Sequence, residues 1–201
     1  MCLKATARSV PEPLRIAVLG GTFDPVHDGH VSIAREALAC PDIDRVVVVP
    51  ASVPSFKQGT VKASVEDRLE MCRLAFRDLD GVIVSDAEAS REGVSYTSDT
   101  AEELRRMFPD AEISFLIGSD AAWFLPEWNN AETLAESMRF HILRREGSGI
   151  DADELLERLS SNGFEADIMD ADITEISSTE IRVRLIHGRD VSDLLPENVI
   201  G

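Results

Sequence analysis

Short apolar runs alternate along the chain with stretches in which apolar residues recur every three or four positions. The apolar runs are typical of buried strands and cover residues 15–19, 45–49, 82–84, 113–117, 140–143 and 166–169. The stretches with helical spacing cover residues 31–39, 64–78, 98–107, 131–137 and 153–159, and we expect a last short helix over residues 176–187. Apolar strands that alternate with helices predict an α/β protein, with helices on both faces of a parallel sheet. Such sheets bind ligands beyond the carboxyl ends of the strands, where the strand order reverses.

The length and composition fit one globular domain. The chain has 201 residues, of which 44% are hydrophobic and 28% are charged. We expect a loose N-terminal leader over residues 1–13, which contains Pro11 and Pro13, and a single domain over residues 14–201.

The chain is strongly acidic, with 37 Asp and Glu residues against 20 Lys and Arg residues and a net charge of −17. This balance argues against a nucleic acid as partner. No apolar run approaches the roughly 20 residues that cross a bilayer, so we expect no membrane partner. Cys2, Cys40 and Cys72 are far apart and indicate the reducing cytoplasm. The sequence does not determine the oligomeric state, and a homo-oligomer is one of the states that it leaves open.

The first chemical signal follows the first expected strand. Gly20 and Gly21 allow a tight turn, and His27 and His30 lie at the start of the next helix on either side of Asp28-Gly29. A turn from a strand into a helix presents backbone N–H groups and the positive end of the helix to an anion. The segment lacks the Gly-Lys-Ser/Thr end of a P-loop and the third glycine of the dinucleotide fingerprint. The alternative is a helix that Asp28 caps, with both histidines on the surface.

A second signal lies near the end of the chain, in residues 176–182 (ISSTEIR). Ser177 and Glu180 have the spacing of a capping box, which specifies where a helix begins. Phosphate can be bound here by the N–H groups at the start of this helix, by the hydroxyls of Ser178 and Thr179, and by the guanidinium of Arg182. A capped helix without a ligand is the alternative that this segment alone leaves open.

A third group of residues lies between these two signals. Gly118, Ser119 and Asp120 come directly after an expected strand, and Trp128 follows them. The indole of Trp128 can stack on a flat heterocycle, or it can pack half-buried against the core. Residues 95–100 (SYTSDT) can begin a helix or offer backbone amides to a carboxylate.

Several segments follow one another along the chain: residues 20–27 with His30, 54–57, 68–71, 95–97, 118–120, Trp128 and 176–182. In this order they resemble the nicotinate-nucleotide adenylyltransferase family of the nucleotidylyltransferase superfamily, and the resemblance extends over residues 15–199. It implies a Rossmann-like, doubly wound parallel sheet of the nucleotidylyltransferase type. It also implies that the adenylyl group of ATP is transferred to nicotinate mononucleotide, giving deamido-NAD and pyrophosphate in NAD biosynthesis. The implied cofactor is Mg²⁺, bound mainly through the ATP phosphates.

The resemblance also implies which residues form the site. The catalytic residues are His27, His30 and Arg182, with His30 donating to the α-phosphate in the transition state. The ATP-binding residues are Gly20, Gly21, Thr22, Phe23, His27, His30, Gly118, Asp120, Ile176, Ser178, Thr179 and Arg182. The mononucleotide-binding residues are Lys57, Thr97, Trp128, Asn129 and Arg145. Among the latter, Trp128 would stack on the pyridine ring, the amides near Thr97 and Asn129 would receive its carboxylate, and Lys57 and Arg145 are further candidates for phosphate. Phe56 stands where the family commonly has a histidine.

Other functions stay open at this point. They are an adenylyltransferase acting on nicotinamide mononucleotide or phosphopantetheine, a cytidylyltransferase, and a non-catalytic nucleotide sensor. Trp128 together with residues 95–97 favours a flat pyridine acceptor over a flexible pantetheine arm. The presence of His27, His30 and Arg182 favours an enzyme over a sensor.

Overall fold

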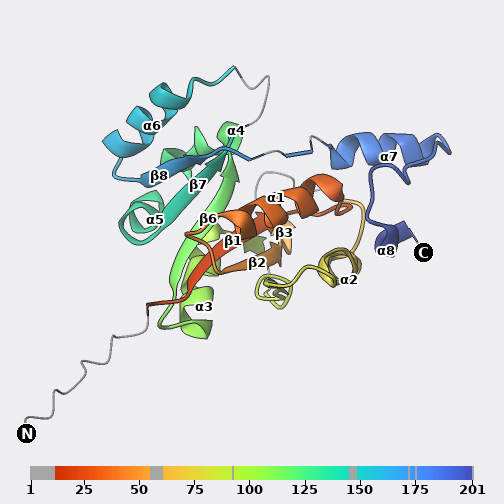
Figure 1. Cartoon of the computed structure of the whole chain (residues 1–201), viewed down its shortest axis with the longest axis horizontal. Coiled ribbons are helices and arrows are strands. Elements are labelled where there is room, and N and C mark those ends of the chain that lie inside the picture. Colours follow the sequence, from red (N-terminus) through yellow and green to blue (C-terminus); the bar gives the residue numbers. More distant parts are fainter. Residues whose placement is uncertain are drawn as a thin grey trace, which may run out of the picture.

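The computed structural model describes residues 12–54, 61–91, 93–144, 149–171, 173–174 and 176–200, and Figure 1 shows a central sheet with helices on both faces. Six parallel strands form the sheet in the order β4-β2-β1-β6-β7-β8. Their bounds are β1 Arg15–Gly21, β2 Arg45–Pro50, β4 Val82–Val84, β6 Glu112–Gly118, β7 Arg139–Leu143 and β8 Glu165–Met169. All six expected strands are confirmed, and the chain is an α/β protein of the doubly wound, Rossmann-like type.

The strand order reverses between β1 and β6. From β1 the chain moves outward through β2 to β4, returns to β6 beside β1, and continues through β7 to β8. The two central strands are in parallel register, with Leu19 of β1 opposite Leu116 of β6. Because open α/β sheets bind ligands at such a reversal, the carboxyl ends of β1 and β6 are the first place to look for a site.

Alternate side chains of each strand enter two hydrophobic clusters, one on each face of the sheet. Val18 and Val47 lie in the cluster beneath α3, α5 and α6, whereas Ala17 and Val46 lie in the cluster beneath α1 and α2. Both faces are covered, and this is why the strands appear in the sequence as continuous apolar runs. The main helices are α1 Asp28–Ala39, α2 Val65–Phe76, α3 Thr97–Met107, α5 Ala131–Ser137, α6 Ala152–Ser161 and α7 Ser178–Ile186. In the described ranges every helix is too short or too polar to span a bilayer.

The structure adds short elements that periodicity does not predict. They are the paired strands β3 Val53–Pro54 and β5 Val94–Ser95, the helices α4 Ser119–Ala122 and α8 Glu197–Ile200, and the 3-10 helix η1 Leu125–Glu127. Elements of two to four residues are too short for a periodic pattern to emerge. Helix α1 begins at Asp28 instead of residue 31, because Gly29 and His30 interrupt the apolar pattern in its first turn.

The C-terminal segment folds back past the start of α1, as Figure 1 shows. The carbonyl of Leu194, beyond α7, accepts from the N–H of Asp28 at 3.1 Å. Ile181 of α7 is fully buried in a small cluster of its own. Arg77, at the end of α2, donates to Asn198 of α8 at 2.7 Å. These contacts hold the C-terminal motif beside the N-terminal one.

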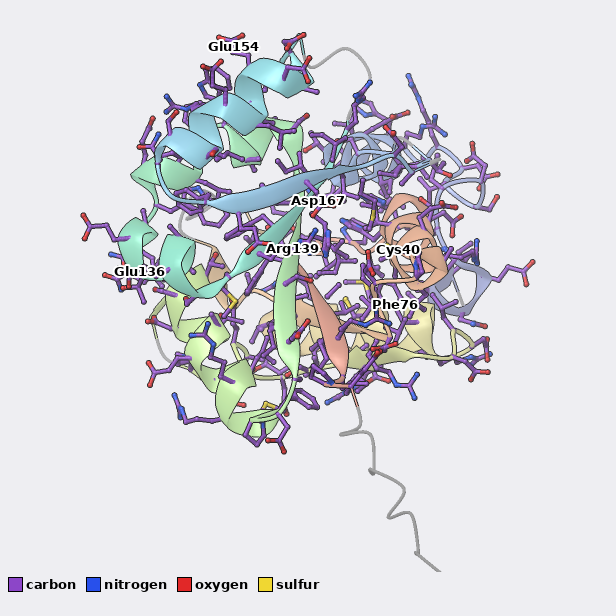
Figure 2. The ribbon with its side chains drawn as sticks, turned by 60° about the vertical axis from the view of Figure 1, so that its left-hand side comes forward. Cys40, Phe76, Glu136, Arg139, Glu154 and Asp167 are labelled. Atoms are coloured by element: carbon purple, nitrogen blue, oxygen red, sulfur yellow. The ribbon has the colours of Figure 1, made fainter. Side chains whose placement is uncertain are left out.

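Charged side chains lie on the edge strand β8 and on its neighbour β7 (Figure 2). Asp167 of β8 accepts from Arg139 of β7 at 3.1 Å and lies 3.0 Å from Nδ1 of His141. His141 is buried, so its ring needs this partner. The cross-strand pairs explain why polar residues interrupt two strands that are otherwise apolar.

Candidate active site

The glycine turn lies at the reversal point of the sheet. Gly20 and Gly21 end β1, and Gly118 ends the neighbouring strand β6. Helix α1 begins shortly after the turn, and Asp120 lies in the short helix that follows Gly118. The predicted ATP-binding residues of the first and third signals therefore meet at one edge of the sheet, where parallel sheets bind anions.

Glycine is suited to the two positions of the turn for different structural reasons. A Cβ on Gly20 would meet no atom within 4 Å, so the backbone here is open to a ligand. A Cβ on Gly21 would lie 2.9 Å from the ring of Phe23, which is buried beneath the turn with 1% exposure. Phe23 has a φ of 50°, a left-handed conformation that is uncommon for a residue with a side chain. The turn is thus built around one buried ring.

His27 and His30 lie side by side at the start of α1. Their rings stack with centroids 3.6 Å apart, and the ring of Phe23 meets His30 edge-on at 4.8 Å. His27 is the N-cap residue, and its backbone N–H donates to Nδ1 of His30 at 3.2 Å. Since Nδ1 accepts this bond, the neutral imidazole of His30 carries its proton on Nε2, on the far side of the ring. The turn of the helix thereby fixes His30 as a hydrogen-bond donor.

The alternative in which Asp28 caps α1 is wrong, because His27 holds the N-cap position and Asp28 is the first helical residue. Burial raises the pKa of the Asp28 carboxyl, and the charge of Arg35 opposes this shift.

The next residue, Gly29, has no space for a side chain. A Cβ there would lie 2.6 Å from the carbonyl oxygen of Thr174 and 3.0 Å from Nδ1 of His27. The segment that leads to α7 thus passes directly over the first turn of α1.

Helix α7 is joined to the glycine turn by direct hydrogen bonds. The hydroxyl of Ser178 donates to the carbonyl of Pro25 at 3.0 Å. Arg182 donates from Nη1 to the carbonyl of Asp24 at 2.5 Å and from Nη2 to Oγ1 of Thr179 at 3.1 Å. Two motifs from opposite ends of the sequence therefore form one cluster of donors around one helix start.

The capping box expected at the start of α7 is only half formed. Ser177 is the N-cap residue and accepts from the N–H of Thr179 at 3.2 Å. Glu180 does not return a bond to Ser177 in the described structure, but accepts from Arg184 at 2.7 Å. An arginine one turn later offers the carboxylate a charged donor, which is a stronger partner than a backbone N–H.

Asp24 is a residue of this site that sequence reasoning did not single out. Its carboxylate is 5% exposed and accepts from the backbone N–H groups of Lys62 and Ala63 at 2.8 and 3.1 Å. It also lies 3.8 Å from Nη1 of Arg182. The only sequence signal for this role is the position of Asp24 inside the turn, because its partners lie 38, 39 and 158 positions away.

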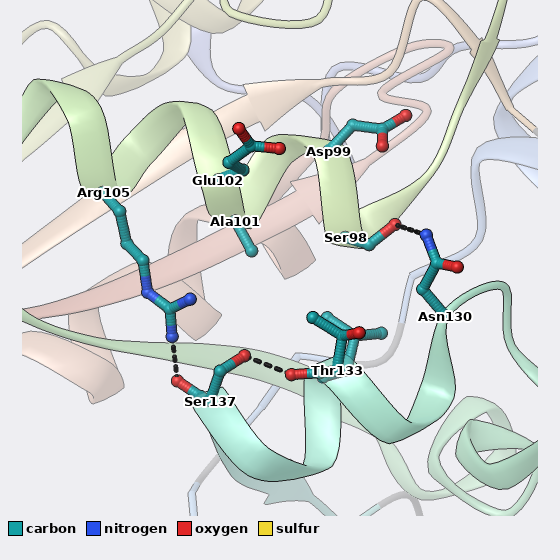
Figure 3. Close-up of a pocket in the computed structure, with 9 residues that line it drawn as sticks. Ser98, Asp99, Ala101, Glu102, Arg105, Asn130, Thr133 and Ser137 are labelled. Carbon is teal, nitrogen blue, oxygen red and sulfur yellow. Dashed lines mark hydrogen bonds between the residues drawn. The ribbon is translucent and has the colours of Figure 1, made fainter.

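Three of the residues expected to bind the mononucleotide, Thr97, Trp128 and Asn129, lie at the starts of α3 and α5. Thr97 is the first residue of α3, and Trp128 follows η1, where its half-buried indole packs against the larger hydrophobic cluster. Asn129 is exposed beside Asn130, whose side-chain amide donates to the hydroxyl of Ser98 at 3.3 Å (Figure 3). This bond ties the loop of Trp128 to the start of α3. A pocket of about 230 Å³, lined mainly by polar and charged residues, opens between α3 and α5 below this bond.

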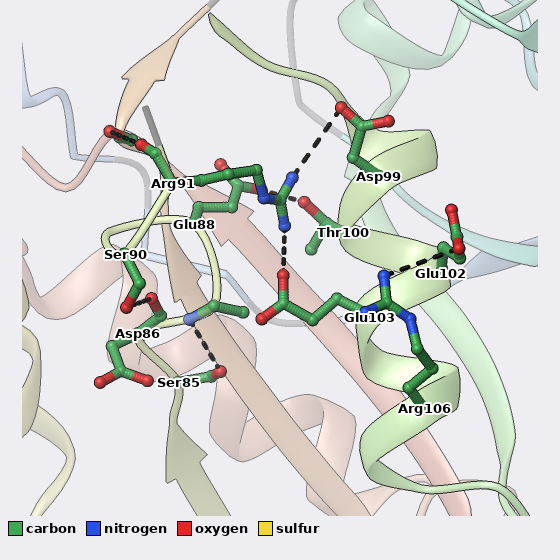
Figure 4. A network of polar contacts seen from close by, with 12 residues as sticks. Ser85, Asp86, Glu88, Ser90, Arg91, Asp99, Thr100, Glu102, Glu103 and Arg106 are labelled. Carbon is green, nitrogen blue, oxygen red and sulfur yellow. Dashed lines mark hydrogen bonds and ion pairs between the residues drawn. The ribbon is translucent and has the colours of Figure 1, made fainter. Parts of the chain in front are cut away.

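A network of polar contacts fixes the start of α3 from the other side (Figure 4). The buried carboxylate of Glu88 accepts from the hydroxyl of Thr100 at 2.5 Å. Arg91 donates to Glu103 at 2.5 Å and lies 3.9 Å from Asp99. The first turns of α3 are therefore held to residues 85–91, so the backbone amides near Thr97 have a fixed position.

Lys57, Arg145 and Phe56 lie outside the described residues. Residues 1–11, which make up most of the expected leader and include Cys2 and Pro11, lie outside them as well. Ile176 is described and packs beside Ile181 under the start of α7.

Comparisons with known proteins agree with this arrangement. Residues 18–184 match the family model described as cytidylyltransferase-like. A protein of Exiguobacterium sibiricum is 39% identical over 186 residues, which cover 92% of this chain and 94% of the relative. A protein of Gemmatimonas aurantiaca is 33% identical over 186 residues, covering 92% and 88%. Both are described as probable nicotinate-nucleotide adenylyltransferases. The solved structure of Plasmodium falciparum nicotinic acid mononucleotide adenylyltransferase complexed with NaAD has a TM-score of 0.76 at 21% identity, with 92% and 93% of the chains covered, and supports the fold.

Proposed function

The chain belongs to the cytidylyltransferase-like family and, within it, to the nicotinate-nucleotide adenylyltransferases, and we propose from this membership the reaction that it catalyses. The adenylyl group of ATP is transferred to nicotinate mononucleotide, with deamido-NAD and pyrophosphate as products. The reaction is a step of NAD biosynthesis. One observation from the structure carries the assignment. The glycine turn, the histidine pair and the start of α7 form a single cluster of anion-binding donors at the reversal point of the sheet.

The chemistry explains why these donors suffice. The acceptor is a phosphate monoester with a second pKa of about 6, so it is mostly a dianion at neutral pH and needs no strong general base. Its oxygen attacks the α-phosphorus of ATP, and the bond from that phosphorus to the bridging oxygen of pyrophosphate breaks. Catalysis can then rest on alignment of the two substrates and on stabilisation of charge at the phosphoryl oxygens.

In this proposal each part of the cluster binds one part of ATP. The amides of the glycine turn, with Thr22, hold phosphate oxygens, and Nε2–H of His30 donates to the α-phosphate as charge develops. His27 donates beside it. The N-terminus of α7 and the guanidinium of Arg182 hold the outer phosphates. The bonds from Arg182 to Asp24 and Thr179 support this role because they fix the guanidinium at the edge of the turn.

The acceptor binds on the α3 side of the sheet. We place its pyridine ring on the exposed part of Trp128 and its carboxylate at the amides near Thr97 and Asn129. The bond between Ser98 and Asn130 supports this arrangement, because it sets the spacing between the ring and the start of α3.

Mg²⁺ is the proposed cofactor and is carried by the phosphates of ATP. Among the described residues, no group of three or more His, Cys, Asp or Glu side chains could hold a metal ion. The Nε2–H of His30 and the guanidinium of Arg182 suit an anion, and the Asp24 carboxylate beside them already accepts from two backbone N–H groups, which fits a metal held by phosphate oxygens. When bound there, the ion neutralises charge on those oxygens.

A reducing compartment is consistent with the state of the cysteines. Cys40 and Cys72 are free thiols, and burial raises the pKa of Cys72 to about 12. Free thiols persist in the cytoplasm, which is the location we propose. ATP and nicotinate mononucleotide are the proposed partners.

The test is an assay of pyrophosphate release with one donor and one acceptor at a time. Purified protein with ATP, Mg²⁺ and nicotinate mononucleotide is expected to release pyrophosphate and to form deamido-NAD, detected by chromatography. Nicotinamide mononucleotide and phosphopantetheine are the matched acceptors, CTP is the matched donor, and His30→Ala controls for contaminating activity. Higher kcat/KM with either other acceptor, or with CTP, would contradict the proposal.

A further inference from the structure

Arg68 of α2 is a buried arginine whose hydrogen bonds end on backbone carbonyls of two loops. The side chain is 1% exposed. Nη1 donates to the carbonyl of Thr22 at 2.7 Å and to that of Ala51 at 2.6 Å, and Nη2 donates to the carbonyl of Ser52 at 2.9 Å. Thr22 follows β1, and the other two carbonyls follow β2, so one guanidinium joins the loops at the carboxyl ends of adjacent strands.

Burial of a cation between two loops costs desolvation free energy. Burial lowers the pKa of Arg68, and nearby negative groups, Asp24 foremost, raise it again. Arginine stays charged in proteins, so the charge is kept in the interior. Buried charged groups often give less stability than apolar residues of the same size. The arrangement is therefore better explained by what the three bonds orient than by what they add to stability.

The bond to Thr22 sets the direction of the next N–H group. The peptide unit between Thr22 and Phe23 is planar, so its C=O and N–H point in opposite directions when it is trans. With the carbonyl of Thr22 directed at the buried guanidinium of Arg68, the N–H of Phe23 points away from that guanidinium.

The residue that carries this N–H is in a strained conformation. Phe23 has a φ of 50°, and such conformations are energetically unfavourable for a residue with a side chain, so they persist only where the surroundings enforce them. Its ring lies under Gly21 and against the edge of His30. A change at the Thr22–Phe23 peptide therefore moves both an amide donor and the support of the proposed catalytic imidazole.

We propose that Arg68 is a positioning residue of the ATP site: it holds the Thr22–Phe23 peptide so that the N–H of Phe23 donates to an ATP phosphate and the ring of Phe23 supports His30. The proposal rests on the proposed function for the identity of the anion. Arg68 itself lies beneath the turn and does not contact ATP; it acts only through the Thr22–Phe23 peptide and the ring of Phe23.

The first test is Arg68→Lys. Lysine keeps the charge but is a single point donor, and it cannot hold carbonyls of two loops as a planar guanidinium does. Because misplacement by about 1 Å can cost about 100-fold in rate, we expect ATP affinity to fall by about ten-fold or more and kcat to fall with it, whereas KM for the mononucleotide changes little. The matched control is Leu159→Ala, in the cluster on the opposite face, which lowers Tm but leaves the ATP affinity of the folded protein unchanged. Wild-type ATP affinity and kcat in a folded Arg68→Lys protein would overturn the proposal.

The second test uses the wild-type protein and needs no variant to fold. The backbone amide of Phe23 is followed by NMR while ATP is added. A large shift of this amide on binding supports the proposal, and bound ATP with an unmoved Phe23 amide overturns it. ATP binding without formation of deamido-NAD contradicts the proposed function instead, so the two failures are distinguishable.

Discussion

Arg182 donates to the backbone carbonyl of Asp24, a residue 158 positions earlier in the chain. The same guanidinium bonds Thr179 one turn before it and lies 3.8 Å from the carboxylate of Asp24. Asp24 is itself fixed by two backbone N–H groups from the segment that leads to α2. One arginine thus connects the glycine turn with α7, and each of its two terminal nitrogens donates one hydrogen bond within the protein before any ligand binds.

Replacement of Arg182 by lysine is expected to weaken ATP binding by roughly ten-fold and to leave the fold intact, because an ammonium cannot grip Asp24, Thr179 and a phosphate with one planar group. ATP affinity measured by calorimetry tests this. The control is Arg184→Lys on the same helix, where the arginine pairs with Glu180 and Asp193 at the surface. Equal ATP affinity in the two variants would mean that Arg182 does not bind ATP and is only a surface residue of the helix.

His30 offers a prediction that separates its two ring nitrogens. Asparagine can place an oxygen near the position of Nδ1 and keep the bond from the N–H of His27, whereas glutamine can place an amide N–H near the position of Nε2. We expect His30→Ala and His30→Asn to lower kcat by about 10²–10³, with a much smaller loss of ATP affinity, and His30→Gln to retain more activity than either. Single-turnover rates at saturating ATP measure this. If asparagine supports turnover better than glutamine, the proton on Nε2 is not the one that matters.

Asp44 provides a pH-dependent prediction for the opposite end of the sheet. Hydrogen bonds from Arg15, at 2.9 Å from its backbone N–H and 2.9 Å from Nη2, lower the pKa of the Asp44 carboxyl from 3.8 to about 2. A lowered pKa means that the stabilisation is complete above pH 3.8 and is lost as the pH falls through about 2. Asp44→Asn should therefore lower Tm at neutral pH, and the difference from wild type should close over that interval. Asp42→Asn, which removes a more exposed partner of Arg15, is the control, with a small effect at every pH. A difference for Asp44→Asn that persists below pH 2 would contradict the attribution.

The sheet and the glycine turn could be predicted because their causes are local. Each position of β2 between Val46 and Val49 is buried on one face or the other, so the strand appears directly as an apolar run. The turn needs glycine at Gly21 because of Phe23, only two positions away. The parallel direction of the strands, though not their order in the sheet, was predicted from the alternation of strands and helices alone.

The remaining features depend on partners that are distant in sequence or that compete. In the sequence Arg68 is an ordinary helix arginine, and its burial follows only when β1, β2 and α2 come together. Glu180 has suitable partners on both sides, and the choice of Arg184 over the N-cap depends on side-chain geometry that spacing does not encode. The links from Asn130 to Ser98 and from Arg91 to Glu103 are likewise tertiary contacts between separate segments.

Trp128 is the residue on which the proposed preference for a pyridine acceptor depends. Its role can be tested by comparison with a second tryptophan in the same cluster. Trp123 and Trp128 both pack, partly buried, against the larger hydrophobic cluster, and Trp123 is covered by the guanidinium of Arg158 at 5.0 Å. If Trp128 stacks on the pyridine ring, Trp128→Ala should weaken the mononucleotide far more than ATP. Stacking of this kind contributes on the order of 1–3 kcal/mol, which corresponds to roughly five- to 150-fold in affinity.

The matched variant Trp123→Ala removes the same side chain from the same cluster without touching the proposed ring site. It is expected to lower Tm while leaving both Michaelis constants near wild type, because its loss is one of packing. Measurement of both Michaelis constants and of thermal unfolding for the two variants separates stacking from packing. If Trp128→Ala behaves like Trp123→Ala, or loses affinity for ATP and the mononucleotide equally, Trp128 is a core residue. The preference for a flat pyridine acceptor would then have to come from the amides at the start of α3.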